Sequence, residues 1–258
     1  MFSLEGRVAV VTGGAGLYGR QIVGALAEAG ARVFVAARTL EPLEELAAAH
    51  RAAGRRVDAL SFDQGDEASV LALRDAVLRE SGGAVDVLVN NAVARTMARG
   101  MEDDAAAFAE SMRINATGLF AVTRAFGDAM AARGKGGSIV NIGSIQGMVG
   151  PDEWIYEGTG MHGFYPDYFF HKGGMVNFTR FAAAYYGRHG VRCNCLSPGG
   201  FRTEKMPERF VEQYSRRTFL GRLAGEEDLG GPVVFLASDA SAYVTGVNLP
   251  VDGGYTAK

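Results

Sequence analysis

The chain has 258 residues, of which 48% are hydrophobic and 21% charged, and its formal net charge is -3. These values are typical of a globular protein and exclude a strongly basic nucleic-acid-binding or membrane-surface chain. No apolar run approaches the length of a transmembrane helix, and the first residues lack the pattern of a secretory signal, so we expect a cytoplasmic protein.

Two cysteines, Cys193 and Cys195, are separated by one residue in a strand-like run. Alternation along a strand places both side chains on one face of a sheet. We interpret them as reduced packing thiols, because two thiols are too few for a structural zinc site. The histidines show no metal-binding spacing either, so no metal is expected.

Short valine-rich apolar runs alternate along the chain with longer segments of helical periodicity. The runs suit strands that are buried on both faces of a parallel sheet. They predict strands at 7–11, 31–37, 57–62, 85–89, 137–142 and 191–196. Apolar stripes, capping residues and alanine content predict helices at 20–30, 41–50 and about 104–133.

This repeated order of strand and helix predicts an α/β protein with a Rossmann-like, doubly wound parallel sheet. No proline- or serine-rich linker interrupts it, so we interpret residues 1–258 as a single domain. Ligands of such sheets bind beyond the carboxyl ends of the strands. Functional residues are therefore expected directly after strands.

A glycine-rich turn, TGGAGLYG (12–19), follows the first predicted strand and opens a helix. A dinucleotide pyrophosphate needs such a tight turn, close approach of the backbone, and the unpaired N–H groups of a helix N-terminus. The turn therefore indicates nucleotide binding, and a turn selected only for packing is the alternative. The candidate cofactor residues in it are Gly13, Gly14, Gly16, Leu17, Tyr18 and Gly19.

The turn resembles the T-G-x-x-x-G-x-G motif of the short-chain dehydrogenase/reductase family. Thr12, Gly13 and Gly19 match it, whereas Leu17 stands in place of the middle glycine and Gly16 precedes that position. Further motifs similar to those of the family follow in order over nearly the whole chain: Asp63, VNNA (89–92), Asn115, Ser144, Tyr168, Lys172, LSPGGFRT (196–203) and VDGGY (251–255).

The resemblance implies an enzyme that interconverts a secondary alcohol and a ketone by hydride transfer, with Asn115, Ser144, Tyr168 and Lys172 as catalytic residues. Tyr168 is the implied general acid/base. An ordinary tyrosine, with a pKa of about 10, is poorly poised for this role at neutral pH, and a cation one helical turn away favours its charged form. Lys172 is the implied cation and ribose contact, Ser144 the partner of the substrate oxygen, and Asn115 the holder of a water linked to Lys172.

The residues that end the second predicted strand are expected to select the nicotinamide cofactor. Ala37 stands where an acid would bind the ribose hydroxyls of NAD, and Arg38 suits the 2′-phosphate of NADP in charge and geometry. With a further hydroxyl from Thr39, NADP(H) is favoured, and NAD(H) is the alternative if Arg38 only stacks on the adenine. The resemblance implies these remaining cofactor contacts: Asp63, Asn91, Ala92, Lys172, Pro198, Gly199 and Thr203.

Residues 145–167 form a longer connection between Ser144 and Tyr168 than is typical of the family. A long aromatic loop between catalytic residues favours a role in shaping the substrate pocket. The run IYEGT resembles insertions of sugar- and polyol-modifying members, which favours a polar substrate, whereas the aromatic content favours an apolar or aromatic ketone. The substrate candidates are Trp154, Tyr156 and Phe164.

Two other functions fit the same fold: a non-catalytic nucleotide-binding regulator or scaffold, and a sugar-nucleotide epimerase. The complete catalytic set argues against the first, and the second is usually accompanied by a longer C-terminal domain. The resemblance also implies a homotetramer. Small residues on the predicted 104–133 helix, and at 173–174 and 182–184 on the helix that carries Tyr168, suit close pairing of helices between subunits.

Overall fold

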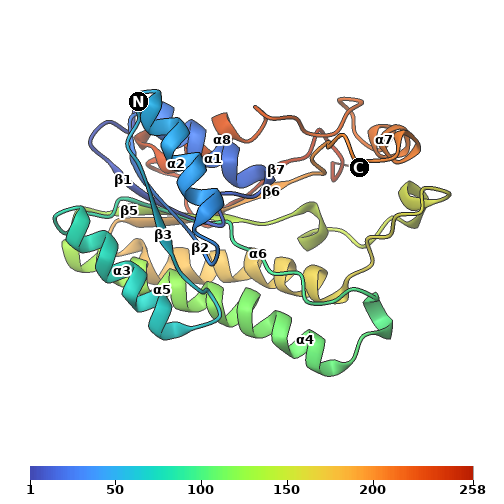
Figure 1. Cartoon of the computed structure of the whole chain (residues 1–258), viewed down its shortest axis with the longest axis horizontal. Coiled ribbons are helices and arrows are strands. Elements are labelled where there is room, and N and C mark those ends of the chain that lie inside the picture. The colour runs from blue at the N-terminus through green and yellow to red at the C-terminus, as the bar shows by residue number, and fades with distance from the viewer. Residues whose placement is uncertain (258) are drawn as a thin grey trace.

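A parallel sheet of seven strands lies between two layers of helices in the computed structural model, which describes residues 1–257 (Figure 1). The strand order is β3-β2-β1-β4-β5-β6-β7, so the chain reverses direction across the sheet between β1 and β4. The strands are β1 (Val8–Thr12), β2 (Arg32–Ala37), β3 (Val57–Ser61), β4 (Val87–Asn90), β5 (Gly137–Ile142), β6 (Val191–Pro198) and β7 (Asn248–Val251).

The Rossmann-like fold class is confirmed, and each of the six predicted strands is present with bounds that differ by no more than two residues. The sequence analysis missed β7. This strand has only four residues, includes Pro250 and pairs with β6 alone at the edge of the sheet. Proline cannot donate a hydrogen bond to a neighbouring strand, so a proline within a run of residues normally argues against a strand. At the edge of a sheet it is nevertheless tolerated.

Three helices cover one face of the sheet, α1 (Leu17–Glu28), α2 (Glu41–Ala52) and α8 (Gly230–Ala237). The other face is covered by α3 (Glu67–Glu80), α5 (Gly118–Arg133) and α6 (Pro166–Gly187), and α4 (Ala105–Met112) packs beside α6. Successive strand residues supply the two cores, because side chains alternate across a sheet: Val33 and Val35 pack on the first side and Phe34 on the second. Burial on both faces explains the valine-rich runs.

The helical segment predicted at about 104–133 is present but not uniform. A π-helical stretch, Arg113–Thr117, joins α4 to α5 and carries the buried side chain of Asn115. Such stretches widen a helix locally and are frequent at functional sites. Within residues 1–257, no helix is both long and apolar enough to cross a bilayer.

The 145–167 segment contains two 3-10 turns, Ile145–Gly147 and Glu153–Tyr156, and packs against α7 (Glu208–Ser215). Ile145 and Ile155 share a small apolar cluster with side chains of α7. The carboxylate of Asp152 pairs with Arg217 just beyond that helix, at 2.7 Å. The segment is therefore docked on the protein. Two further 3-10 turns lie at Gly100–Glu102 and Asp239–Ser241.

Candidate active site

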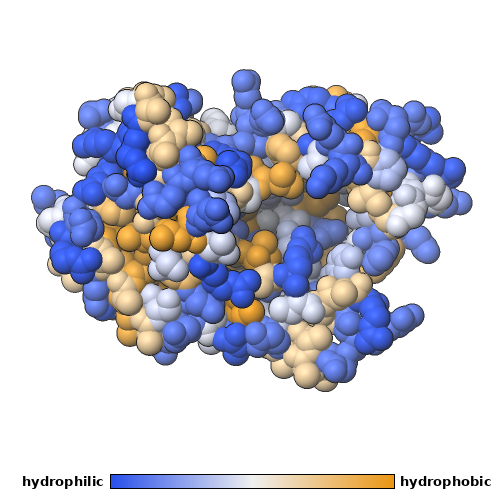
Figure 2. All heavy atoms as spheres, viewed as in Figure 1, coloured by the Kyte–Doolittle hydropathy of each residue, from blue (hydrophilic) through white to orange (hydrophobic). Residues whose placement is uncertain are grey.

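A cleft of about 670 Å³ opens at the carboxyl ends of the central strands. In the space-filling view, the surface is hollowed right of centre (Figure 2). Most of the lining comes from segments at the carboxyl ends of strands, which is where the sequence predicts functional residues. It includes residues at or after the ends of β1 (13 and 15–19), β2 (37–39), β3 (62–64), β4 (91–95), β5 (144–146) and β6 (199–201).

The glycine turn has no room for side chains at its closest contacts. Gly13 adopts a φ of 68°, and a Cβ there would lie 2.7 Å from the Cα of Ala92. A Cβ on Gly19 would lie 2.4 Å from the carbonyl oxygen of Gly13, so the turn and the first turn of α1 are in backbone contact. Gly14 faces the opposite way and packs on Val35. The turn thus offers backbone, not side chains, to a ligand.

Leu17, which departs from the family motif, opens α1 and lines the cleft with its side chain 58% exposed. The residue is helical and its side chain lies outside the close backbone contacts, so leucine is accommodated there. Gly16 is the N-cap of α1, and no side chain within residues 1–257 caps the helix. The first-turn N–H groups therefore remain available to an anionic ligand.

Thr12 and Asn91 join the end of β4 to the glycine turn. The Oγ1 of Thr12 accepts hydrogen bonds from the backbone N–H groups of Asn91 and Ala92, both at 3.0 Å. The Nδ2 of Asn91 donates to the carbonyl oxygens of Thr12 at 3.0 Å and Gly13 at 2.8 Å. This network fixes the VNNA run beside the turn, and Asn91 and Ala92 line the cleft.

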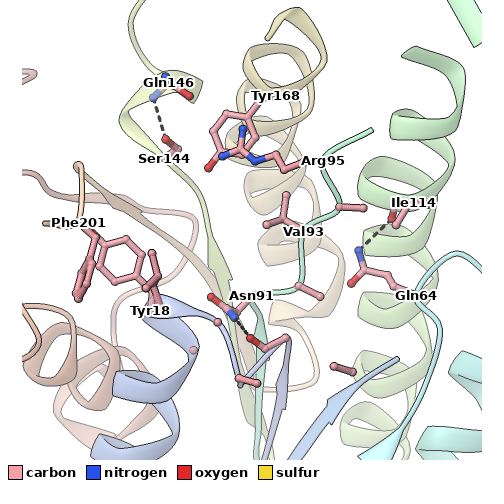
Figure 3. Close-up of a pocket in the computed structure, with 18 of the residues that line it drawn as sticks. Tyr18, Gln64, Asn91, Val93, Arg95, Ile114, Ser144, Gln146, Tyr168 and Phe201 are labelled. Atoms are coloured by element: carbon pink, nitrogen blue, oxygen red, sulfur yellow. Dashed lines mark hydrogen bonds between the residues drawn. The ribbon is translucent and has the colours of Figure 1, made fainter. Parts of the chain in front are cut away.

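Tyr18 connects the helix after the glycine turn to the loop after β6. Its hydroxyl donates to the carbonyl oxygen of Gly199 at 2.7 Å, and its ring meets that of Phe201 at 5.3 Å between centroids (Figure 3). Burial raises the pKa of Tyr18, so the phenol stays protonated and keeps donating. Gly199 lines the cleft, whereas the predicted cofactor residues Pro198 and Thr203 lie outside its lining.

The outer end of the cleft carries Arg38, Thr39 and Asp63. Arg38 and Thr39 are exposed just after β2. In the part of the chain that the structure describes, no carboxylate pairs with the Arg38 guanidinium. The Oδ1 of Asp63 accepts the N–H of Gly65 at 2.8 Å and closes the turn after β3. This end therefore offers one unneutralised guanidinium.

Ser144 and Tyr168 face the inner end of the cleft from β5 and from the first turn of α6 (Figure 3). The Ser144 Oγ accepts the N–H of Gln146 at 3.1 Å, which leaves its own proton free to donate. One helical turn beyond Tyr168, Lys172 is buried behind the lining, and its Nζ donates to the carbonyl oxygen of Ile142 at 2.5 Å.

The ammonium of Lys172 lies 5.6 Å from the centroid of the Tyr168 ring. Burial lowers the pKa of Lys172, and the nearby Tyr168 opposes that shift. The structure thus brings Ser144, Tyr168 and Lys172 together around one end of the cleft. Their arrangement suits the transfer of a proton at a substrate oxygen.

Asn115 lies behind this group and binds the backbone of the β4 loop. Its Oδ1 accepts the N–H of Ala94 at 2.8 Å, and its Nδ2 donates to the carbonyl oxygen of Ala94 at 2.9 Å and to the Oγ of Ser111 at 3.0 Å. Ser111 in turn donates to the buried carboxylate of Asp167 at 2.5 Å. Both N–H groups of Asn115 are committed inside the protein, so only its oxygen atoms remain for the water that the resemblance implies.

Arg95 is a cleft residue that the sequence analysis missed. Its guanidinium carbon lies 3.7 Å from the centroid of the Tyr168 ring, and it extends from the β4 loop across that ring (Figure 3). The sequence signal that could have identified it is a basic residue four positions after Asn91, in a loop that directly follows a buried strand. Nothing in the local sequence showed that this loop passes over a tyrosine 73 positions later in the chain.

Of the three substrate candidates in the 145–167 segment, only Tyr156 lines the cleft. Trp154 lies outside it, 37% exposed, with the guanidinium carbon of Arg217 4.8 Å from its ring centroid. Phe164 and Trp154 instead border a separate hollow on the far side of Tyr156. Trp154 and Phe164 therefore do not reach the cleft in this structure, although the sequence makes them substrate candidates with Tyr156. Trp154 packs on the arginine that anchors the segment to α7.

Comparisons with known proteins agree over nearly the full length of the chain. The family model described as "Enoyl-(Acyl carrier protein) reductase" matches residues 16–256. Galactitol 2-dehydrogenase (L-tagatose-forming) of Cereibacter sphaeroides is 37% identical over 262 residues, which cover 99% of this chain and 97% of that protein.

Two solved structures extend the similarity to three dimensions. One is a short-chain alcohol dehydrogenase of Sinorhizobium meliloti 1021, which is 37% identical with a TM-score of 0.88 and coverage of 100% of this chain and 99% of that chain. The other is a gluconate 5-dehydrogenase of Burkholderia cenocepacia J2315 in complex with NADP and tartrate, which is 34% identical with a TM-score of 0.88 and coverage of 100% and 98%. The chain belongs to the short-chain dehydrogenase/reductase family and is an NAD(P)-dependent alcohol dehydrogenase.

Proposed function

We propose that the protein interconverts a hydroxyl and a ketone on a polyhydroxylated, sugar-type substrate and prefers NADP(H). The observation that carries this proposal is that Ser144, Tyr168 and Lys172 lie at the inner end of the same cleft that the glycine turn lines. The similar proteins named for galactitol and gluconate support a sugar-type substrate.

The residues of the cleft fit a nicotinamide dinucleotide. The glycine turn provides close backbone approach and open N–H groups for the pyrophosphate. Arg38 and Thr39 would hold the 2′-phosphate on the adenosine ribose of NADP. Lys172 would hold the other ribose, which carries the nicotinamide. A bound nicotinamide supplies or accepts the hydride. The chain itself must orient the substrate and move one proton.

We assign that proton to Tyr168. In the direction of reduction, its hydroxyl donates to the substrate oxygen, and the nearby ammonium of Lys172 stabilises the resulting tyrosinate. Ser144 donates a hydrogen bond to the same substrate oxygen, since its own Oγ is oriented by the N–H of Gln146. In the direction of oxidation, Tyr168 takes the proton back.

The inner end of the cleft mixes polar and apolar side chains. Gln146 and Tyr156 offer hydrogen-bonding groups to substrate hydroxyls, and this supports a polyhydroxylated substrate. The apolar side chains of Ile145, Met206 and Phe210 complete the lining and support the alternative of an apolar ketone. Both classes must therefore be tested.

A panel of alditols, sugars, sugar acids and aryl ketones should be assayed with NADP(H) and NAD(H) at the nicotinamide absorbance. We expect turnover of hydroxyl-rich compounds with NADP(H). Turnover confined to aryl or alkyl ketones would contradict the sugar-type substrate.

We also propose that the chain is a single domain and assembles as a homotetramer through α5 and α6. Of the small residues expected at this interface, Ala182 and Ala183 face the core, whereas Gly174 and Ala184 are exposed. The exposed side of the two helices also carries a strip of aromatic rings: Phe120, Phe178, Phe181 and Tyr185. A large exposed apolar strip is typical of a protein interface. Light scattering of wild type and Phe181→Asp tests it, and a monomeric wild type would contradict it.

A further inference from the structure

We infer that the substrate carries a carboxylate and that Arg95 binds it, so that the preferred substrate is a polyhydroxy acid and not a neutral polyol. This inference rests on the proposed sugar-type function and narrows its chemical class. The similar proteins leave the choice open, since galactitol is neutral and gluconate is an acid. The argument therefore comes from the cleft.

Arg95 presents unused hydrogen-bond donors beside the general acid/base. Its guanidinium lies over the Tyr168 ring, 3.7 Å from the centroid (Figure 3). Stacking engages the face of a guanidinium and leaves the N–H groups along its edge free. Among residues 1–257, no acceptor or carboxylate takes those N–H groups. This edge matches the geometry of a carboxylate, which accepts two parallel hydrogen bonds from one arginine.

The charged groups around the inner end of the cleft carry a net positive charge. Three charged residues line the cleft, and two of them, Arg38 and Asp63, follow β2 and β3 at the distant edge of the sheet. Arg95 is the charged lining residue near Ser144, and Lys172 adds a second cation behind Tyr168. The carboxylate of Asp167, next to Tyr168 in the chain, is buried, accepts a hydrogen bond from Ser111 and offsets one of these two cations. A substrate anion would neutralise the positive charge that remains.

The backbone that carries Arg95 is held in place. Asn115 binds both the N–H and the carbonyl oxygen of Ala94, the preceding residue. Farther along the loop, Asp103 accepts the N–H groups of Ala98 and Arg99, both at 2.8 Å. A guanidinium on a fixed backbone loses less freedom when it binds a ligand. The Arg95 side chain itself is exposed, and these backbone contacts suit a residue that recognises a ligand.

The neighbours of Arg95 then define the rest of the ligand. Ser144 and Tyr168 mark the reacting oxygen, and two further polar residues, Gln146 and Tyr156, belong to the same lining. The ligand thus has a carboxylate for Arg95, one hydroxyl for Tyr168 and further hydroxyls for Gln146 and Tyr156. A sugar acid of the aldonate type carries these groups.

The test compares aldonates with alditols of the same carbon chain, such as gluconate with glucitol, and includes four- and five-carbon pairs. The variants are Arg95→Met, which keeps an unbranched apolar stem without the guanidinium, and Arg95→Lys, which keeps the charge without the fork. Arg99→Met is the matched control, because this arginine lies in the same loop but pairs with Asp103 outside the cleft lining.

We expect wild type to favour aldonates and Arg95→Met to raise their KM about 10- to 100-fold, with Arg95→Lys between the two. The KM of alditols, the Kd of NADPH and all constants of Arg99→Met should stay the same. Equal losses for both substrate classes, accompanied by a displaced pH profile, would show that Arg95 acts only on Tyr168 and would overturn the inference. Turnover of alditols alone would also overturn it but leave the proposed function standing, whereas no turnover of either class would contradict the proposed function itself.

Discussion

Asn115 holds the backbone of Ala94 from both sides, accepting its N–H at 2.8 Å and donating to its carbonyl oxygen at 2.9 Å. The same side chain donates to Ser111, which donates to Asp167. The two ends of this buried chain of hydrogen bonds directly precede Arg95 and Tyr168. The relative position of those two side chains therefore depends on Asn115.

Replacing Asn115 with Ala should loosen the β4 loop, because the half-buried N–H and carbonyl groups of Ala94 lose their partner. We expect the free energy of unfolding to fall by about 1–3 kcal/mol and turnover to fall with it, as measured by urea unfolding and steady-state kinetics. Ser111→Ala should have a smaller effect, and the double variant should lose less than the sum. Strictly additive losses would show that Asn115 and Ser111 do not act together through this series of hydrogen bonds.

Arg38 is predicted to select the 2′-phosphate. Arg38→Ala should weaken NADPH about 10- to 100-fold and leave NADH nearly unchanged, as measured by fluorescence titration of each cofactor. The matched control is Arg56→Ala, an exposed arginine that pairs with Glu5 away from the cleft. Equal changes in the affinities of the two cofactors would contradict the role of Arg38.

Acid should destabilise the protein through His171. Burial, together with the positive charges of Lys172 and Arg95, lowers the pKa of His171 to about 3. The folded protein therefore keeps this imidazole neutral at a pH where the unfolded chain, with a pKa near 6.5, already binds a proton. Stability is lost as the pH falls from about 6.5 towards 3, with a slope of at most about 1.4 kcal/mol per pH unit.

The His171→Leu variant lacks the imidazole that binds this proton in the unfolded chain. Urea unfolding between pH 7.5 and 4.5 should give a flatter dependence for the variant than for wild type. Parallel curves would contradict the assignment.

Within the 145–167 segment, Tyr156 and not Trp154 is expected to contact the substrate. Tyr156→Phe should raise the KM about 3- to 10-fold, since the phenol of this lining residue is proposed to bind a substrate hydroxyl. Trp154→Ala should leave the KM nearly unchanged but lower the stability of the segment, because the ring packs on Arg217. Kinetics and hydrogen exchange of the two variants distinguish these effects. A raised KM for Trp154→Ala, with an unchanged KM for Tyr156→Phe, would show instead that Trp154 contacts the substrate.

The sequence predicted those features that depend on local pattern. Valine runs such as 7–11 identified buried parallel strands, and the glycine turn identified the end of the sheet at which the cleft opens, because periodicity and turn chemistry act over a few residues. Contacts between distant segments were not predictable. The stacking of Arg95 on Tyr168 and the docking of residues 145–167 on α7 depend on how loops meet in space. The π-helical stretch at Asn115 also had no separate signal in its helical periodicity.

The central claim is that Tyr168 moves the proton during alcohol oxidation and ketone reduction. Its most direct test is the steady-state turnover of Tyr168→Phe with the best substrate of the panel, at saturating NADP(H), together with the Kd of NADPH. Only the transferable proton is removed, so turnover should fall about 100- to 10,000-fold while the Kd stays the same. Turnover within a few-fold of wild type would contradict the account.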